Sequence, residues 1–371
     1  MSKLIKIVYT FSISIKYIEI SGHFMKNREI KLEKFERKYY YKAGVDLDIN
    51  DNKPKAKLTQ KGIDLVSQYY SYKYQMPPLI KTFSGDELIE KIKSEEFSNI
   101  RNSPDDVRIS LIMTGCHSIP VVYIKQGGKE YLLILDSLGY TGIEQTVAEA
   151  LPDITCYAMP PKAIRQRDFY SCHSEAQVIL RELTGKDETG NFLIPDILNK
   201  IEKHEIKVNK QAEFPNNLHV IKLFDSLLMT VQNPAFKEAH EEEFKSKEAI
   251  RRYKGGHENI QKFFDKYPAE EMSNSARKPN VSSYSREKGL KFTQIIEIQF
   301  YLNQLQSNLG NKFTKEIKDD FISAAKKEVK QYGKIASLSE KQNNALYDLA
   351  QKTLSENLGI DITMRMHHRY D

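Results

Sequence analysis

Cysteine is scarce in this sequence, which has only three in 371 residues: Cys116, Cys156 and Cys172. So small and odd a set does not form a disulfide framework. The chain also has no CxxC pair of the kind used in zinc or redox sites. We therefore expect an intracellular, reducing compartment, in which the cysteines stay free thiols.

Long apolar runs are missing too, since no stretch approaches the ~20 apolar residues that a membrane-spanning helix needs. Residues 7–15 lean apolar and follow Lys3 and Lys6, but no small-x-small cleavage site comes after them. Their partial alternation predicts a strand rather than a cleaved signal peptide.

Neither sign of charge is in large excess, because 56 Lys and Arg face 50 Asp and Glu, a net charge of +6. The sequence shows no compact Lys/Arg block interleaved with aromatic residues. A balance this modest does not establish nucleic-acid binding, and we expect no nucleic-acid partner.

What the sequence does contain predicts an α+β fold. Apolar runs at 107–113, 119–124, 131–135 and 154–159 predict four strands, and Gly127-Gly128 between the second and third favours a hairpin turn. A helical pattern follows over 173–183. Earlier in the chain we expect a loop at 46–54, a helix at 58–74 and a helix capped by Ser84 and Glu87.

From about residue 195 the pattern predicts helix after helix. An apolar stripe runs from Leu218 to Leu228, and opposite charges four residues apart over 237–254 indicate a solvated helix. Residues 271–285 are typical of an exposed linker, and helices are expected at 292–305, 313–329 and 338–354. Such stripes are usually packing faces rather than sites.

These patterns suggest three parts of the chain. Residues 1–104 would form the N-terminal part of the domain and a substrate-binding extension. Residues 105–190 would form the catalytic core, and 191–371 an all-α C-terminal region that packs on it or recruits a target.

Four residues in the centre carry chemistry: His117, Asp136, Gln166 and Cys172. A thiolate is a nucleophile, an imidazole activates it, and a carboxylate orients the imidazole. A side-chain amide can donate to the oxyanion that develops during acyl transfer. The four residue types, in this order, predict thiol catalysis.

Their expected placement supports that hypothesis. His117 stands just before one hairpin strand and Asp136 just after the other, so pairing should bring them together. Cys172 falls at the predicted start of the 173–183 helix, where free N–H groups lower a thiol pKa. Gln166, six residues before it, would donate to the oxyanion together with the Cys172 backbone N–H.

Each residue alone has a simpler interpretation, such as a buried thiol for Cys172 or a turn residue for Asp136. His173 is a rival base, although adjacent side chains at a helix start should point in different directions. Cys116 is better explained as a core residue than as a second nucleophile. The pair His367-His368 lacks ligand partners at metal-binding spacing, so no metal or other cofactor is expected.

The order His117, Asp136-Ser137, Gln166, Cys172 resembles that of the clan CE cysteine proteases. This clan includes the Ulp/SENP-type proteases of ubiquitin-like modifiers, the adenovirus protease and related bacterial effectors. The resemblance covers roughly residues 105–185. It implies an Ulp/adenain-like, papain-type core with a central mixed sheet flanked by helices.

Two departures from the clan pattern affect the choice of relatives. Ser118 follows the histidine where many members have tryptophan, and this chain has no tryptophan. Ser171-Cys172-His173 replaces the usual Asp-Cys-Gly. Both favour divergent bacterial effector proteases, which would be delivered into a host cytoplasm, over an orthodox SUMO protease.

The resemblance implies an (iso)peptidase, a deubiquitinase in the broad sense, that removes ubiquitin or a ubiquitin-like modifier from a target protein. Two alternatives stay open. YopJ-type acetyltransferases use a similar His/acidic/Cys set and depend on an inositol phosphate bound by basic residues, but usually carry Glu as the acid, and no clear basic cluster is visible in this sequence. The second alternative is a non-enzymatic helical interaction protein with a degenerate protease core.

Overall fold

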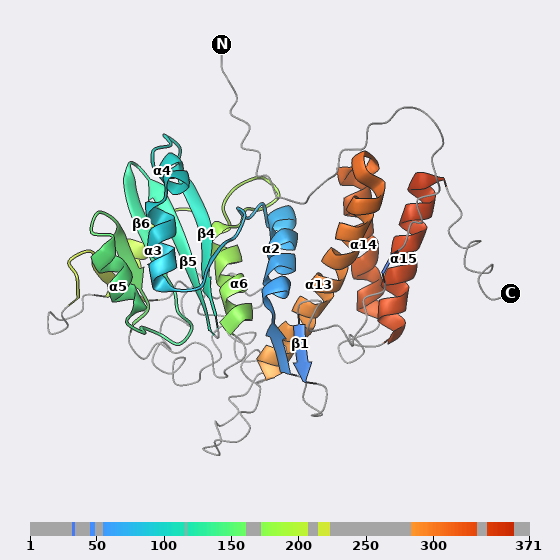
Figure 1. Ribbon diagram of the computed structural model, residues 1–371, viewed down its shortest axis with the longest axis horizontal. Helices are drawn as coiled ribbons and strands as arrows, with labels where there is room; N and C mark the ends of the chain where they lie inside the picture. The colour runs from blue at the N-terminus through green and yellow to red at the C-terminus, as the bar shows by residue number, and fades with distance from the viewer. Residues whose placement is uncertain are drawn as a thin grey trace, which may run out of the picture. The chain divides into compact units, whose positions relative to one another are not determined.

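The computed structural model describes residues 32–33, 45–48, 55–115, 117–160, 172–206, 214–222, 283–331 and 340–359. By internal contacts the chain divides into two units, Met1–Leu32 and Glu33–Asp371. Every helix and strand described below belongs to the second unit, and most are labelled in Figure 1.

The described residues include a mixed sheet of seven strands in the order β3-β4-β5-β6-β7-β9-β8. Strands β4, β5 and β6 pair antiparallel, β3, β7 and β9 join the sheet in parallel, and β8 closes it antiparallel to β9. This is the α+β architecture predicted from the sequence. The strands are β3 (Ile80–Thr82), β4 (Val107–Thr114), β5 (Ser118–Gln126), β6 (Lys129–Ile134), β7 (Thr155–Ala158), β8 (Glu205–Ile206) and β9 (Leu218–Ile221).

The hairpin between β5 and β6 turns at Gly127 and Gly128, as predicted. Their φ angles of 58° and 75° lie in the left-handed region, which suits the twist of a two-residue hairpin turn and favours glycine at both positions. Pairing runs from Gln126 opposite Lys129 to Val121 opposite Ile134, so the register is fixed along the whole hairpin.

Helices cover both faces of the sheet, which explains why its strands are apolar on both sides. Alternate residues of β4, β5 and β6 pack against α3 (Gly85–Lys93), α4 (Glu95–Arg101) and α5 (Ile143–Ala150) in one buried cluster. Figure 1 shows α3 and α5 in front of the sheet. The intervening residue Ser110 points the other way and hydrogen-bonds Thr184 of α6 (Cys172–Thr184) at 2.6 Å.

A second layer lies beyond α6. Helix α2 (Gln60–Tyr74) contacts α6, and α13 (Ser283–Leu309) contacts α2. The Tyr70 and Phe292 rings meet with centroids 6.4 Å apart. The predicted apolar stripe of α13 is buried, which confirms it as a packing face; its residues are Ile295, Ile298, Leu302 and Leu305.

The remaining described elements are smaller or lie at the C-terminal end. A two-stranded antiparallel ribbon pairs β1 (Val45–Asp48) with β2 (Lys55–Leu58). Helices α14 (Lys315–Gln331) and α15 (Glu340–Leu358) contact α13, as does the 3₁₀ turn η2 (Gly310–Lys312). Helix α7 is Ile197–His204.

Several sequence predictions are confirmed by these elements. The helix expected at 58–74 is α2, and the three expected after 292 are α13, α14 and α15. Ser84 caps α3 by accepting from Glu87 N at 3.1 Å, and the Glu87 carboxylate accepts from Phe83 N at 2.5 Å. This reciprocal pair closely follows the predicted capping box.

Two predictions were wrong in detail. The helix expected from Leu218 is strand β9 over its first four residues, because Leu218, Val220 and Ile221 are buried in the sheet and tertiary pairing overrides the helical stripe. The loop expected at 46–54 contains most of β1. The seven-stranded sheet extends beyond the predicted core of residues 105–190, since it includes β3 before residue 105 and β8 and β9 after residue 190. The C-terminal part is therefore not all helical, contrary to the expectation.

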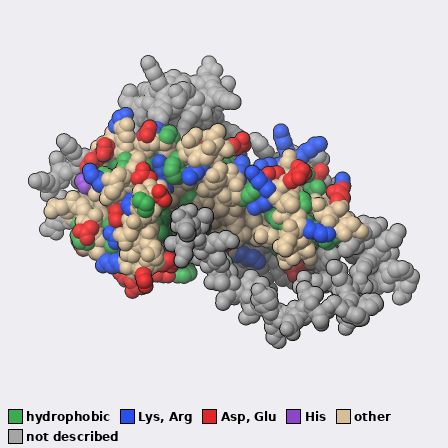
Figure 2. All heavy atoms as spheres, turned by 90° about the horizontal axis from the view of Figure 1, so that it is seen from above, with side chains coloured by type: hydrophobic (Ala, Val, Ile, Leu, Met, Phe, Trp, Pro, Cys, Tyr) green, Lys and Arg blue, Asp and Glu red, His purple; other side chains and the backbone are tan. Residues whose placement is uncertain are grey.

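Other predictions concern residues outside the described ranges: the strand at 7–15, the helix at 237–254, most of the linker at 271–285 and the His367-His368 pair. Among the helices that are described, none combines the length and apolarity needed to cross a membrane. On the face seen in Figure 2, acidic and basic side chains are interspersed, in line with the modest net charge.

Candidate active site

The β5–β6 hairpin brings His117 and Asp136 into contact, although nineteen residues separate them. His117 precedes β5, Asp136 follows β6, and the antiparallel register places these two ends side by side. His117 Nε2 lies 2.7 Å from Asp136 Oδ1. The geometry expected from the sequence is therefore present.

The aspartate is held rigidly. Asp136 is fully buried, and its Oδ1 also accepts from the backbone N–H of Leu138 at 2.8 Å. Because a carboxylate only accepts, His117 donates its Nε2–H to Asp136. The other ring nitrogen, Nδ1, is then the one that exchanges a proton with a thiol.

Cys172 is the first residue of α6 and is 1% exposed. The structure thus confirms the predicted helix and places the thiol at its N-terminus. There, unpaired backbone N–H groups and the positive end of the helix dipole favour an anion. His117 also acts on this thiol, since it is among the groups that lower the pKa of Cys172.

The electrostatics of this pair favour charge separation. Burial alone would raise the pKa of Cys172, but hydrogen bonds from His117 and His173 outweigh it and lower that pKa to about 6. Burial alone would lower the pKa of His117, but hydrogen bonds with Asp136 and Cys172 raise it to about 10. Near neutral pH the pair therefore rests as thiolate and imidazolium.

His173 contradicts one expectation. Its Nδ1 lies 3.1 Å from Cys172 Sγ, whereas neighbouring side chains at a helix start were expected to point apart. Helical side chains lean toward the N-terminus, and at the second residue of a helix no preceding turn blocks that rotation. The His173 ring is buried, with 2% of its surface exposed.

Glu144 is a residue that the sequence argument missed. It is fully buried on α5, and its Oε2 accepts from the backbone N–H groups of Thr141 and Gly142 at 3.1 and 3.0 Å. Burial raises the pKa of Glu144, and the nearby charge of Asp136 adds to that increase. The spacing Thr141-x-x-Glu144 is a capping-box signal that would have found it.

The remaining predicted residues divide into two groups. Gln166 and Cys116 lie outside the described residues, so the oxyanion donor stays a prediction. Cys156 is buried in β7, where burial raises the pKa of its thiol to about 12 and makes it inert. Within the described part of the chain, no group of three His, Cys, Asp or Glu side chains is arranged to hold a metal ion.

Comparisons with known proteins leave the family open. No family model matches the chain, and no curated protein matches it significantly. A solved structure of AvrA delL154 with IP6 and CoA is similar at a TM-score of 0.42 and 16% identity, covering 62% of this chain and 85% of that one. The central domain of the uncharacterized Lpg1148 protein from Legionella pneumophila gives a TM-score of 0.25 at 16% identity, covering 36% and 84%.

Both TM-scores lie below 0.5, so neither likeness establishes a shared fold. The Ulp/adenain-like core therefore stays a prediction, and the function has to be argued from the site itself.

Proposed function

We propose that the protein is a thiol (iso)peptidase of clan CE type that removes ubiquitin or a ubiquitin-like modifier from target proteins. One observation carries the proposal: a thiol at a helix N-terminus has its pKa lowered by an imidazole whose Nε2 is held by a buried carboxylate at 2.7 Å. Such an arrangement serves nucleophilic acyl transfer.

The chemistry follows from the charge state of the pair. The Cys172 thiolate attacks the carbonyl carbon of the modifier's terminal glycine, and an S–C bond forms. When the C–N bond breaks, the His117 imidazolium passes its Nδ1 proton to the leaving amine. In the second half, His117 takes a proton from water, whose oxygen displaces Sγ and releases the modifier's carboxylate.

The backbone N–H of Cys172 and the side-chain amide of Gln166 are proposed as the two donors to the developing oxyanion. No cofactor takes part in this scheme. The 1–104 segment and the C-terminal helices are proposed to select the modifier and its target. The departures at Ser118 and His173 favour a bacterial effector that acts in a host cytoplasm.

A panel of propargylamide probes built on ubiquitin, SUMO and the neddylation modifier tests this proposal. The wild-type protein should form a covalent adduct with at least one probe at Cys172, and Cys172→Ala should abolish the adduct. Cys156→Ala, which alters an inert core thiol, is the matched control and should label as the wild type does. Full labelling of Cys172→Ala would overturn the nucleophile assignment.

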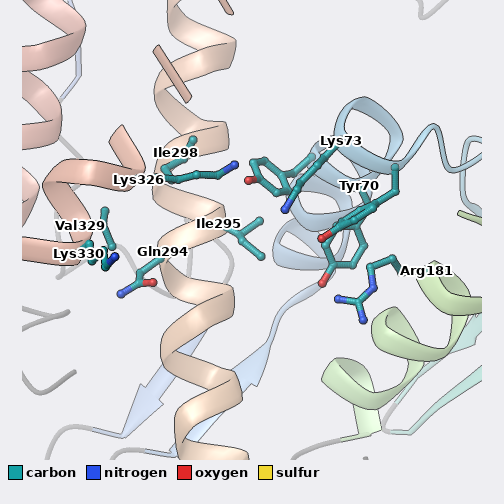
Figure 3. A pocket seen from close by; sticks show the side chains of 11 residues that line it. Tyr70, Lys73, Arg181, Gln294, Ile295, Ile298, Lys326, Val329 and Lys330 are labelled. Atoms are coloured by element: carbon teal, nitrogen blue, oxygen red, sulfur yellow. The ribbon is translucent and has the colours of Figure 1, made fainter. Parts of the chain in front are cut away.

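A second candidate function, a YopJ-like acetyltransferase using the same cysteine, gains one observation from the structure. The sequence shows no basic cluster, yet four cations gather around a pocket of about 540 Å³: Lys73 of α2, Arg181 of α6, and Lys326 and Lys330 of α14. Figure 3 shows Lys73 and Lys326 extending toward one another across this pocket.

These cations lack enough counter-charge. Burial, and after it the charge of Lys73, lower the pKa of Lys326, while Tyr74 and Asp319 act in the opposite direction. Arg181 pairs with Glu182. Among the described residues, no carboxylate lies within ion-pair distance of Lys73, Lys326 or Lys330. A polyanion such as an inositol phosphate would supply the missing charge.

Labelled acetyl-CoA, with and without inositol hexakisphosphate, separates the two candidates. An acetyltransferase should acetylate itself only when the polyphosphate is present. Lys326→Glu should abolish this polyphosphate-stimulated acetylation. Lys315→Glu, an exposed change on the same helix, should have no effect. If the modifier probes label Cys172 and no acetyl transfer occurs, the result supports the peptidase over the acetyltransferase.

A further inference from the structure

Two imidazoles act on Cys172. His173, at the next position of α6, brings its Nδ1 to 3.1 Å from Sγ, and His117, from the loop before β5, also lowers the pKa of the thiol. Both histidine rings are largely shielded, since the His117 side chain is 23% exposed and His173 only 2%. The standard scheme of thiol catalysis uses one imidazole and leaves the second without a role.

We infer that His173 is a positioning residue that holds Cys172 as a thiolate by donating its Nδ1–H to Sγ, independently of His117. A thiolate has several lone pairs and accepts from two donors at once. A hydrogen bond to an ionised acceptor is also stronger than one to a neutral acceptor. The inference rests on the proposed nucleophile but not on the choice between a peptidase and an acetyltransferase.

Surrounding charges leave this role to the two histidines. Asp136 pairs with Nε2 of His117 rather than with the thiol, and the Glu144 carboxylate accepts from the backbone N–H groups of Thr141 and Gly142. Helix α6 packs against β5, β4, α2, β2 and α13. Of these elements, β4 brings Arg108 and α2 brings Tyr70, and both meet α6 near its other end. Arg108 donates to the Leu183 carbonyl, and Tyr70 faces Arg181. Glu175 is buried on α6 itself and has its own partners.

Two donors divide the work that one imidazole does alone. His117 passes its Nδ1 proton to the leaving amine while the sulfur is being acylated and takes a proton from water in the second half, so its Nδ1–H comes and goes during the cycle. His173 keeps its Nδ1–H throughout. When water later displaces the acyl group, Cys172 is expelled as a thiolate that already has a donor, so it leaves without taking a proton.

The test measures the thiolate directly, without any substrate. Iodoacetamide alkylates the thiolate: an S–C bond forms and iodide leaves, so the pH dependence of the rate reports the ionisation of Cys172. Peptide-level mass spectrometry separates Cys172 from Cys116 and Cys156. The variants are His173→Asn, which keeps a donor near the Nδ1 position, and His173→Leu, which has the same branching but no donor.

His173→Leu should move the alkylation midpoint of Cys172 upward by at least one pH unit, and His173→Asn should restore most of that shift. His117→Ala should also raise the alkylation midpoint of Cys172. That midpoint should stay below the midpoint of the double variant that combines His117→Ala with His173→Leu. A midpoint in His173→Leu within 0.3 units of the wild type, with Asn and Leu indistinguishable, overturns the inference. A wild-type midpoint near that of a free thiol would instead contradict the proposed nucleophile.

Discussion

The imidazole of His117 and the carboxylate of Asp136 meet at 2.7 Å across the open end of the β5–β6 hairpin, opposite its turn. Asp136 is fully buried, so its charge is little screened and the contact fixes both the position and the tautomer of the histidine. Substitution at Asp136 therefore tests the site more finely than removal of the thiol.

Asp136→Asn keeps the size of the side chain but removes its charge and allows the wrong histidine tautomer. We expect turnover of a modifier substrate to fall by about 10³-fold or more, with a much smaller change in KM. Steady-state kinetics with a fluorogenic modifier substrate measures both. Unchanged turnover would show that Asp136 only packs against the hairpin.

The pKa values of the pair predict a bell-shaped pH profile. The thiolate is lost as pH falls through about 6, and the imidazolium of His117 is lost as pH rises through about 10. Below pH 6 the turnover rate should drop about tenfold per unit. Alkylation of Cys172 needs no proton donor, so it should keep the acid limb and lose the alkaline one. An alkylation midpoint above pH 8 would contradict the expected ion pair.

Glu144→Ala should loosen the segment that carries Asp136. The change leaves the N–H groups of Thr141 and Gly142 without their acceptor, at a cost of about 1–3 kcal/mol. We expect a lower melting temperature together with reduced turnover. Glu149→Ala removes an exposed carboxylate from the same helix and is the control. Equal effects of the two changes would show that Glu144 has no special role.

Asn217 ties the end of α5 to the sheet. The two hydrogens of its amide nitrogen are shared among the carbonyls of Ala148, Leu151 and Ile154, which lie at 3.0, 3.0 and 2.9 Å from Nδ2. Asn217→Ala should reduce the free energy of unfolding by about 1–3 kcal/mol, measured by urea denaturation. The exposed neighbour Asn216 offers the matched control, and Asn216→Ala should change stability by less than about 0.5 kcal/mol.

The C-terminal helices are expected to matter for stability as well as for target choice. Phe292 is 2% exposed and faces Tyr70 of α2, so Phe292→Ala should cost about 3–5 kcal/mol. Deleting residues 286–371 would uncover the same side of α2, so we expect it to unfold the core rather than only weaken target binding. Far-UV circular dichroism and probe labelling of the truncated protein check this. A folded, fully reactive truncation would contradict it.

Local signals in the sequence were sufficient for much of this architecture. The Gly127-Gly128 turn and the apolar runs on either side predicted the hairpin, and with it the meeting of His117 and Asp136. The helix starting at Cys172 followed from a change of hydrophobic period. These features depend on neighbours within about twenty residues, where propensity and pattern act directly.

Features that depend on distant partners were not predictable in the same way. Strand β9 is a strand because β7 offers it an open edge, and no local pattern at Leu218 records that. The basic pocket combines Lys73 with Lys326, which are far apart in the sequence. His173 approaches the thiol through a side-chain rotation that spacing alone cannot reveal.

The hairpin register has a further consequence for protein engineering. Pairing fixes the end that carries His117 and Asp136, whereas the Gly127-Gly128 turn lies at the opposite end of the same two strands. Extra residues inserted at that turn lengthen only the distal loop, but one residue inserted within β6 would turn every later side chain to the other face. The turn is therefore a suitable place to graft a fluorescent tag or an epitope while the contact between His117 and Asp136 is kept.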